Sequence, residues 1–380
     1  MAPKRRSQKL YLPEEVWVEI LSRLPVKTLL RFKCVCSQWR TIISSPSFAS
    51  LHLSHSISNP TRHSILVFDQ YEDQFMSFDP VTFSPIKNFN AGLDRANCFG
   101  SEIMCVGSTN GVLCIIDESG RIWLWNPSTR QYRKLPPGIN DRSTFLSMGF
   151  GRDPVSNDYK VVIIGFRYIR EGEHGTWVEV WSSNLESWRE IKVDYCFRWG
   201  ISVCDVIVEG SVHWFVMDAS RGSRGRMLVA SFDMRTEELG VIPLPESKHN
   251  YIFSGFNWNE KFALTTCDNH RKYRRIYQVW TIERDSVGKE SWSKKFTFEL
   301  NVGSVAQCRS MLNAVNGKVV LDKSGKLIFY DVETRKMKTV GTHEDEFFPL
   351  GAYSYVESLV SIKGFNPLGE DAKEDVVNEN

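Results

Sequence analysis

The 380-residue sequence lacks the features of a membrane or secreted protein. Its longest apolar runs, such as Val161-Val162-Ile163-Ile164, have the length of one β-strand and are too short to cross a bilayer. The N-terminus has no signal-peptide stretch, both Asn-x-Ser/Thr triplets contain a blocking proline, and the nine cysteines show no disulfide-type spacing. We therefore expect a soluble protein of the cytoplasm, the nucleus or both.

An excess of charge of one sign is also absent, because 47 Lys and Arg residues oppose 45 Asp and Glu residues. A protein that binds nucleic acid usually carries a clear cationic excess, and so does one that binds an anionic membrane surface. We therefore expect neither nucleic acid nor a membrane as the main partner.

The sequence contains no recognisable catalytic or cofactor-binding motif. It has no Gly-rich loop that opens a helix, no phosphate-binding Lys-Ser/Thr pair and no His-Glu-x-x-His spacing. Cys34 and Cys36 have no second Cys or His pair nearby, so a structural role is favoured over metal binding. His213 lies in an alternating strand pattern, where a core or surface imidazole is commoner than a catalytic base. We expect a non-catalytic protein without a cofactor or a metal.

Two regions of the chain differ in hydrophobic periodicity. Between Leu12 and Pro46 the apolar residues recur at helical spacing, whereas after His63 they recur in short alternating runs separated by Gly, Asn and Asp. We predict a small all-α domain at residues 8–53, a linker at 54–63, an all-β domain at 64–364 and a disordered acidic tail at 365–380.

The first region is predicted to form three short helices. Pro13 suits the first turn of a helix, and Glu14 and Glu15 complement the positive end of its dipole. Pro25 is expected to end the first helix and Ser44-Ser45-Pro46 the third. The three apolar stripes are Val16, Ile20, Leu21 and Leu24; Val26, Leu29, Leu30 and Phe32; and Val35, Trp39, Ile42 and Ile43.

A unit of roughly 40 residues seldom builds an adequate core alone. Each Leu, Ile or Phe that stays exposed forgoes about 1.5–3 kcal/mol of burial free energy. The helices are therefore expected either to complete their core against another protein or to pack on the domain that follows. The periodicity favours neither alternative.

The second region contains a repeat of roughly fifty residues, which is the size of a propeller blade of the kelch class. Each unit has an alternating apolar strand that ends in an aromatic residue, then a small or polar turn residue, then another strand. The anchors are Phe78-Asp79-Pro80, Trp125-Asn126-Pro127, Trp181-Ser182-Ser183, Phe232-Asp233-Met234, Trp280-Thr281-Ile282 and Tyr330-Asp331-Val332. We predict an all-β propeller of about six four-stranded blades, with a pair of β-sandwiches as the alternative.

The two ends of this region are predicted to pair with each other. The first unit, Ser64 to Phe89, offers only three strands, whereas Ala352 to Ile362 is an apolar strand left over at the far end. Pairing them closes the ring and covers two exposed sheet edges.

Long basic loops are predicted on one face of the propeller. The loops between the second and third strands of units three to five are long and cationic, whereas units two and six have short turns. These loops would form a lopsided rim for an acidic or phosphorylated target segment; alternatively, they are charged only because long loops are solvated. The rim candidates are Arg170, His174, Arg198, Trp199, Arg221, Arg224, Arg226, Arg271, Lys272, Arg274 and Arg275.

The stretch LPEEVWVEILSRLPVKTLLRFKCVCSQWRTIISSPSFASLHL resembles the F-box motif of plant proteins, in its LP start, ILSRLP centre, LLRFKCV segment and closing Trp39 with Phe48. The resemblance implies docking on a Skp-family adaptor and, through it, on a cullin. One departure is Ser37-Gln38 before Trp39, where the family often has a basic residue. The residues implied to build the adaptor-binding module are Leu12, Pro13, Val16, Ile20, Leu24, Pro25, Leu29, Val35, Cys36 and Trp39.

The β region resembles the F-box-associated domain of plant F-box proteins through GSTNGVLCI, WNPSTRQYRKLP, SMGFGRDPVSNDYKVVII, VEVWSSNLESWREI and VEGSVHWF. It departs from kelch repeats in lacking a Gly-Gly doublet in each blade. Together the two resemblances imply the substrate-recognition subunit of a Skp–cullin–F-box ubiquitin ligase, which marks a target protein for proteasomal degradation. The alternatives are an F-box scaffold or inhibitor that does not cause degradation, and a propeller that binds a sugar or another small ligand.

Overall fold

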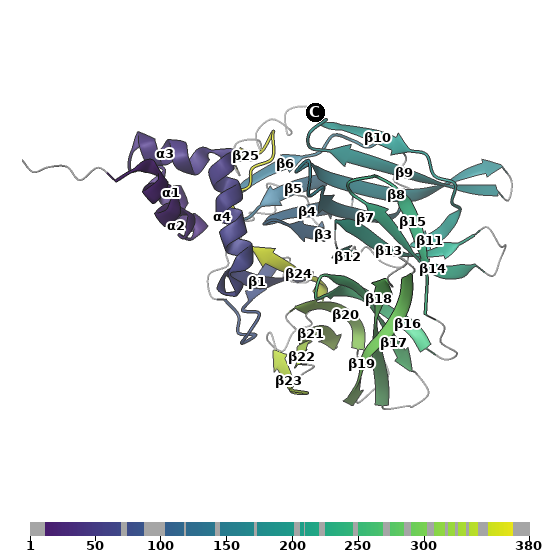
Figure 1. The fold of residues 1–380 in the computed structure, drawn as a ribbon. Helices are drawn as coiled ribbons and strands as arrows, with labels where there is room; N and C mark the ends of the chain where they lie inside the picture. Colours follow the sequence, from purple (N-terminus) through teal and green to yellow (C-terminus); the bar gives the residue numbers. More distant parts are fainter. Residues whose placement is uncertain are drawn as a thin grey trace, which may run out of the picture.

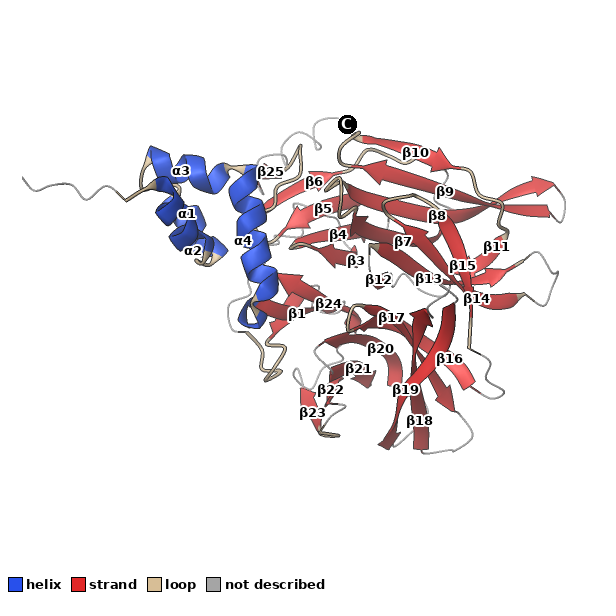
Figure 2. Cartoon of the chain, viewed as in Figure 1, coloured by secondary structure: helices blue, strands red, loops and turns tan. Residues whose placement is uncertain are grey.

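The computed structural model describes most of the chain. The described residues are 12–69, 74–86, 103–117, 119–140, 145–170, 173–200, 206–208, 210–219, 225–245, 250–268, 274–284, 290–301, 308–315, 318–323, 326–331, 334–340 and 349–367. The helices form one lobe and the strands a larger one, as Figure 2 shows. Residues 1–11 and the acidic end beyond residue 367 lie outside the described residues.

The helical lobe contains four α-helices, one more than the sequence predicted. They are α1 (Glu14–Ser22), α2 (Val26–Phe32), α3 (Ser37–Ser44) and α4 (Pro46–Ser58), followed by a 3-10 turn, η1 (Pro60–Arg62). Pro46 does not end the helical region; it occupies the first position of α4. The side chain of Ser45 caps that helix by accepting a hydrogen bond from the Phe48 N–H at 3.2 Å. Helix α4 thus extends into residues 54–58, which the sequence assigned to a linker.

The strands form six sheets arranged as six blades, numbered here in chain order (Figure 1). Blade 1 contains β24 (Pro349–Val356), β1 (His63–Asp69) and β2 (Gln74–Phe78). Blade 2 contains β3 (Ile103–Thr109), β4 (Val112–Asp117), β5 (Ile122–Asn126), β6 (Gln131–Lys134) and β25 (Asn366–Pro367). Blade 3 contains β7 (Phe145–Arg152), β8 (Tyr159–Arg170), β9 (Glu173–Ser182) and β10 (Ser187–Ile191).

The other three blades follow the same antiparallel order. Blade 4 contains β11 (Phe197–Gly200), β12 (Val206–Val208), β13 (Ser211–Asp218), β14 (Arg226–Asp233) and β15 (Leu239–Pro243). Blade 5 contains β16 (Asn250–Trp258), β17 (Lys261–Asp268), β18 (Arg274–Arg284) and β19 (Glu290–Asn301). Blade 6 contains β20 (Cys308–Val315), β21 (Lys318–Lys323), β22 (Lys326–Asp331) and β23 (Met337–Val340). The inner strands of neighbouring blades contact one another around the ring, which confirms the predicted propeller.

In five of the six repeat anchors, the polar residue has a physical role in the turn that follows the third strand. In blade 2, Asn126 Oδ1 accepts hydrogen bonds from the N–H groups of Ser128 at 3.0 Å and Thr129 at 3.3 Å. Arg130, four residues after Asn126, then adopts a positive φ of 56°. The same pair recurs as Asp79 with Phe83, Ser182 with Glu186, Asp233 with Glu237 and Asp331 with Arg335. A side chain that caps the turn explains why these anchors recur.

Blade 5 departs from the predicted repeat. Trp280 and Thr281 lie inside β18, which continues to Arg284, so the predicted turn at Trp280-Thr281-Ile282 is wrong. Thr281 is buried within this strand. Trp280 keeps the spacing of the aromatic residue in the repeat, but β18 continues past it instead of turning.

The C-terminal strand closes the ring as predicted, with different bounds. Strand β24 pairs antiparallel with β1, from His63 opposite Val356 to Asp69 opposite Pro349. The closing strand therefore ends at Val356, and the predicted continuation to Ile362 is not a strand. In blade 1, the expected third strand toward Phe89 appears only as a bridge between Phe78 and Pro85, and residues 87–89 lie outside the described part.

A second closure follows the first. The segment 357–365, named here the latch segment, crosses blade 2, and the short strand β25 then pairs with the outer strand β6, Asn366 opposite Tyr132. Asn126 Nδ2 donates to the carbonyl oxygens of Ser358 at 3.1 Å and Val360 at 2.8 Å. Residues 365–367, which the sequence assigned to the tail, thus belong to the propeller.

The latch segment also joins the propeller to the helices. Leu359, which is only 7% exposed, packs in the helical core with Leu21, Leu29, Ile43 and other apolar side chains. The N–H of Val26 donates to the carboxylate of Glu357. Burial raises the pKa of Glu357 above its ordinary value, although Arg62 and Lys27 act in the opposite direction. The helices therefore complete part of their core on the β-domain, the second of the two predicted alternatives.

Candidate functional site

The helical lobe exposes a line of apolar side chains on α1. Val16 and Ile20 are spaced four residues apart and lie along one side of α1, and Leu12 precedes the helix; the three are 39%, 44% and 36% exposed. Val35, between α2 and α3, is 61% exposed. Because large aliphatic side chains are costly to leave in water, we name these four residues the apolar face of the helical lobe and treat it as a candidate docking surface.

The ten predicted residues of the adaptor-binding module separate into exposed and internal groups. Pro13, Pro25 and Cys36 are exposed, as are the four residues of the apolar face. Leu29 is fully buried. Leu24 and Trp39 are half-buried against the helical core. Cys36 caps α3, because its sulfur accepts a hydrogen bond from the Trp39 N–H at 3.5 Å. Leu29 is thus internal and cannot touch a partner directly.

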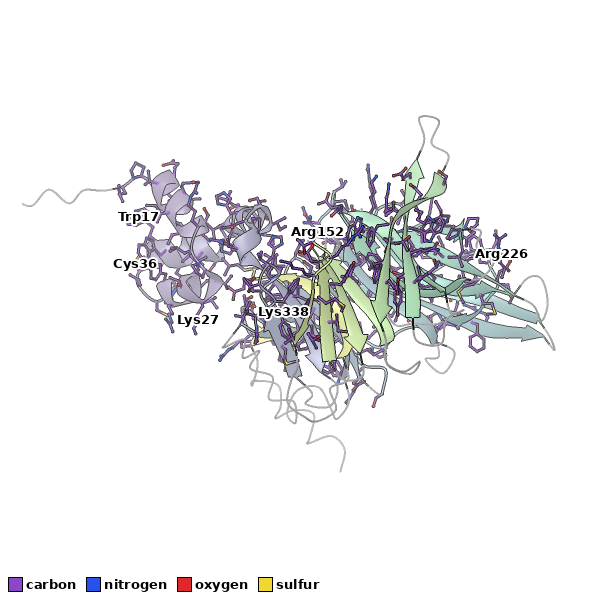
Figure 3. All side chains as sticks on the ribbon, turned by 90° about the horizontal axis from the view of Figure 1, so that it is seen from below. Trp17, Lys27, Cys36, Arg152, Arg226 and Lys338 are labelled. Atoms are coloured by element: carbon purple, nitrogen blue, oxygen red, sulfur yellow. The ribbon has the colours of Figure 1, made fainter. Side chains whose placement is uncertain are left out.

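Trp39 is held in place by neighbouring aromatic rings. Its ring centroid lies 5.2 Å from that of Trp17 in an edge-on arrangement and 4.9 Å from that of Phe32. Figure 3 places Trp17 and Cys36 at the end of the molecule farthest from Arg226, which lies at the opposite extreme of the propeller. The helical lobe and the start of β14 in blade 4 therefore lie at opposite ends of the molecule.

Four of the eleven residues of the predicted cationic rim, Arg221, Arg224, Arg271 and Lys272, lie outside the described residues. Of its eleven candidates, only Arg226 has a described side chain, and it is exposed at the start of β14. The backbone places Arg198 and Trp199 in β11, where Arg198 lies opposite Met217 of β13. These two residues therefore belong to the inner strand of blade 4, not to a connection between blades as the sequence indicated. Arg170, His174, Arg274 and Arg275 lie in the second-to-third-strand hairpins, as expected.

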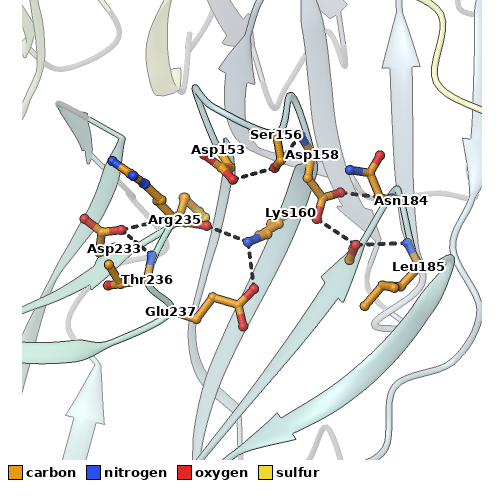
Figure 4. A network of polar contacts seen from close by, with 12 residues as sticks. Asp153, Ser156, Asp158, Lys160, Asn184, Leu185, Asp233, Arg235, Thr236 and Glu237 are labelled. Atoms are coloured by element: carbon orange, nitrogen blue, oxygen red, sulfur yellow. Dashed lines mark hydrogen bonds and ion pairs between the residues drawn. The ribbon is translucent and has the colours of Figure 1, made fainter.

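A buried ion pair joins blades 3 and 4 (Figure 4). Lys160 Nζ, at the start of β8, lies 2.6 Å from Glu237 Oε1 and donates to the Met234 carbonyl at 2.6 Å. Burial acts to raise the pKa of Glu237, but hydrogen bonds from Arg189 and Lys160 outweigh it, so the pKa lies below its ordinary value. All the polar atoms of this contact serve the blade interface, so its role is structural.

A cavity of about 670 Å³ opens between blades 4 and 5. Its polar lining consists of Ser211, His213, Ser231, Asp233, Thr236, Glu238 and Lys261. His213 is 7% exposed, its Nδ1 lies 3.2 Å from the Val206 carbonyl, and its ring stacks on Phe262 at 4.4 Å. Of the core and surface positions that the sequence allowed for His213, the structure shows the core one, but the sequence gave no sign of the cavity beside it.

A second, apolar hollow of about 470 Å³ continues from the first. The two share Ile242 and Ile282, and the second is walled by Pro243, Trp280 and Trp292. Trp292 Nε1 donates to the Pro243 carbonyl at 2.6 Å, which fixes its indole across the blade boundary. We name the two hollows together the 4/5 groove.

Within the described ranges, no cluster of three or more His, Cys, Asp or Glu side chains has the arrangement of a metal site. A helix with the length and hydrophobicity needed to cross a membrane is likewise not found among these residues. The structure presents two candidate surfaces for binding, the apolar face of the helical lobe and the 4/5 groove of the propeller.

Comparison with protein families identifies both parts. Residues 10–51 match the F-box domain, and residues 64–362 match the F-box associated beta propeller domain. The chain belongs to the family of F-box proteins that carry this propeller.

Curated relatives from Arabidopsis thaliana are named as F-box proteins. The F-box protein CPR1 is 27% identical over 360 residues, 87% of this chain and 84% of that protein. An F-box/kelch-repeat protein is 27% identical over 257 residues, 62% of this chain and 65% of that protein. Another F-box protein is 30% identical over 242 residues, 62% of this chain and 61% of that protein. The F-box supports binding to a Skp-type adaptor.

Proposed function

We propose that this protein is the substrate-recognition subunit of a Skp–cullin–F-box ubiquitin ligase. The F-box binds a Skp-family adaptor, and the propeller holds a target protein near the ubiquitin that other subunits carry. No bond is made or broken by this chain; it raises the effective concentration of the target at the ligase.

The observation that carries the proposal is the apolar face. Leu12, Val16 and Ile20 stay exposed, although Leu359 of the latch segment already completes the core of the F-box. A partner that buried Val16 and Ile20 would gain about 1.5–3 kcal/mol from each side chain. The face is therefore best explained as an interface with another protein.

Replacing Val16 and Ile20 with Asp tests the adaptor contact. Burying two carboxylates against an apolar partner removes the hydrophobic gain of both side chains, so the affinity for a Skp-family adaptor should fall by about 100-fold or more. Both positions are exposed, so the melting temperature should change little. Calorimetry with purified adaptor measures the first quantity and scanning fluorimetry the second.

A matched control comes from α4. Ile57 is 49% exposed, similar to Ile20, but lies on another helix outside the apolar face. The Ile57→Asp variant should bind the adaptor like the wild type. Equal binding by the double Asp variant and the wild type would refute the proposed docking surface.

The degradative role needs its own measurement. Target half-life is compared between cells with the wild-type protein and cells with the Val16/Ile20 double Asp variant, with and without a proteasome inhibitor. A longer half-life with the variant supports ubiquitin-dependent degradation. An unchanged half-life of a bound target would identify a scaffold or inhibitor. Charge reversal at Arg221, Arg224, Arg271 and Arg274 tests whether the predicted cationic rim captures the target. Target binding should be lost and adaptor binding kept.

A further inference from the structure

We propose that the 4/5 groove binds an extended peptide segment with a basic side chain, which deepens the proposed function by naming a site and a chemistry for target capture. The proposal rests on the proposed function for its biological meaning. Its evidence is an internal comparison between two equivalent positions of the ring, one filled and one open.

The filled position lies between blades 2 and 3. There the chain's own latch segment lies in an irregular, extended path, and Val360 and Ile362 pack in the core that these two blades share. Asn126, at the end of the third strand of blade 2, holds this segment through two hydrogen bonds from its Nδ2 to backbone carbonyls. The propeller thus already uses this kind of position to hold a polypeptide.

The open position lies at the matching place between blades 4 and 5. Strand pairing sets the correspondence: Cys114 lies opposite Leu124 in blade 2, and His213 lies opposite Ser231 in blade 4. Gly111 and Gly210 directly precede β4 and β13, the second strands of their blades, and both have a φ of 78°. The two positions are therefore built on the same backbone frame.

The latch segment reaches the first of these glycines. A side chain added at Gly111 would meet the Val356 carbonyl at 2.5 Å and Ser358 Oγ at 2.6 Å, because the end of β24 and the start of the latch segment lie against it. The nearest atom to a side chain added at Gly210 belongs to Pro154 of blade 3, at 3.6 Å, which is an ordinary contact distance. Gly210 therefore faces blade 3, and the opening toward blade 5 is the cavity beside His213.

The lining of the open position is polar where that of the filled one is apolar. Val112, Cys114 and Leu124 of the filled position correspond to Ser211, His213 and Ser231 of the cavity. An occupant of the cavity would therefore meet hydrogen-bonding side chains instead of a purely hydrophobic wall. Such a lining favours a polar side chain of a ligand over an aliphatic one.

The residue at the turn anchor, Asn126 in blade 2 and Asp233 in blade 4, indicates which charge the ligand should carry. Asn126 offers N–H donors to the latch segment, whereas Asp233 at the same position offers carboxylate oxygens. Asp233 Oδ1 already accepts the N–H groups of Arg235 at 2.7 Å and Thr236 at 2.8 Å, as the turn requires. Together with Glu238 it gives the cavity two carboxylates against the single ammonium of Lys261. A lysine or arginine side chain complements this lining.

The adjoining hollow explains why the occupant should be a peptide. A single polar ligand would fill the cavity but leave the apolar hollow at Trp280 and Trp292 empty. A peptide that places its basic side chain at Asp233 can lay neighbouring apolar residues against these indoles.

The experiment pans a phage-displayed random heptapeptide library on the full-length protein in complex with its adaptor. Enriched sequences should contain Lys or Arg flanked by aliphatic or aromatic residues. An enriched peptide is then synthesised, and its affinity is measured for the wild type and for three variants. Adaptor binding by the same preparation is recorded in parallel, so that failure of the proposed function is seen separately.

The variants use residues that the same fold already accepts at matching positions. Asp233→Asn keeps the turn cap, as Asn126 does in blade 2, but removes the charge, so the affinity should fall about tenfold or more. Ser231→Leu copies Leu124, fills the cavity and should abolish binding. Asp79→Asn makes the same chemical change in the turn of blade 1, where Asp79 Oδ1 accepts the Val81 N–H at 2.9 Å, and should leave binding unchanged.

Three outcomes would overturn the proposal while adaptor binding persists. One is that no peptide is enriched, and the second is that enriched peptides are acidic. The third is that the enriched peptides bind Asp233→Asn and Ser231→Leu as tightly as the wild type. A glycan that binds the wild type but not Ser231→Leu, with no peptide enriched, would assign the cavity to a small sugar instead.

Discussion

Truncation of Leu359 to Ala is expected to destabilise the F-box strongly while the propeller keeps its stability. Leu359 reaches from the latch segment into the helical core, where it is almost completely buried. Removing its side chain leaves a cavity among Leu21, Leu29 and Ile43, and such Leu→Ala substitutions cost about 2–5 kcal/mol. The F-box helices span roughly 45 residues, for which a total stability of about 2–7 kcal/mol is typical. The loss is thus comparable with the whole stability of the lobe.

Hydrogen exchange measured residue by residue is the suitable assay. Amides of α2 and α3 should exchange about 30-fold faster or more in Leu359→Ala, since about 2 kcal/mol corresponds to that ratio. Amides of blades 3 to 5 should keep their rates, because the core cluster that contains Leu359 includes no described residue of these blades. Adaptor affinity should fall in parallel with F-box stability.

The control is Leu185→Ala, which truncates a leucine that is 62% exposed in a turn of blade 3. It should leave exchange in both lobes unchanged. If Leu359→Ala accelerated exchange only in blades 1 and 2 and left the F-box amides unchanged, the latch segment would not support the F-box, and the reasoning would be refuted.

Two further predictions concern the propeller. Glu237→Gln should destabilise the protein by roughly 1.5–3 kcal/mol at pH 7, since Lys160 loses a charged partner; the lowered pKa of Glu237 means that this contribution is present above the ordinary carboxyl pKa and disappears as the pH falls through the lowered one. Urea unfolding at several pH values checks this, and a constant difference at all pH values would contradict it. Gly111→Ala should cost at least about 1 kcal/mol more than Gly210→Ala, because both strain the same positive φ but only the first collides with the Val356 carbonyl. Equal losses in thermal unfolding would show that the latch segment does not lie on Gly111.

The propeller could be predicted because its repeat has a local cause. A turn needs a capping side chain at one position, and Asn126 and Asp233 satisfy that need through their own neighbours in sequence. Blade 5 shows the limit of such reasoning. Its aromatic residue Trp280 keeps the spacing, but the strand pairing continues to Arg284, and pairing with β19 is not visible in the sequence of β18 alone.

The division of the F-box surface could not be predicted from its hydrophobic pattern. Val16, Ile20, Leu21 and Leu24 read as one stripe, yet the first two are exposed and Leu21 is buried. A stripe that wide contains both the core side and the partner side of the helix, and only the packing of the other helices and of Leu359 against it separates the two.

The fourth helix and the 4/5 groove were missed for different reasons. Ser45-Pro46 ends one helix and begins the next, so a signal that favours an end was used as a start. The groove depends on Ser211, Ser231 and Asp233 being brought together by strand pairing, and none of them is unusual in its own strand. The signal that could have found it is the comparison of blade 4 with blade 2, position by position.

The order in which the chain is translated gives the latch segment a further importance. The F-box helices precede the propeller in the chain, but Leu359 and the closing strand β24 follow blades 2 to 6. A ribosome that stops early would release an F-box that lacks the core residue Leu359 and a propeller that lacks its closing strand. One late segment thereby makes both binding surfaces depend on completed synthesis, so an unfinished chain is impaired in both at once.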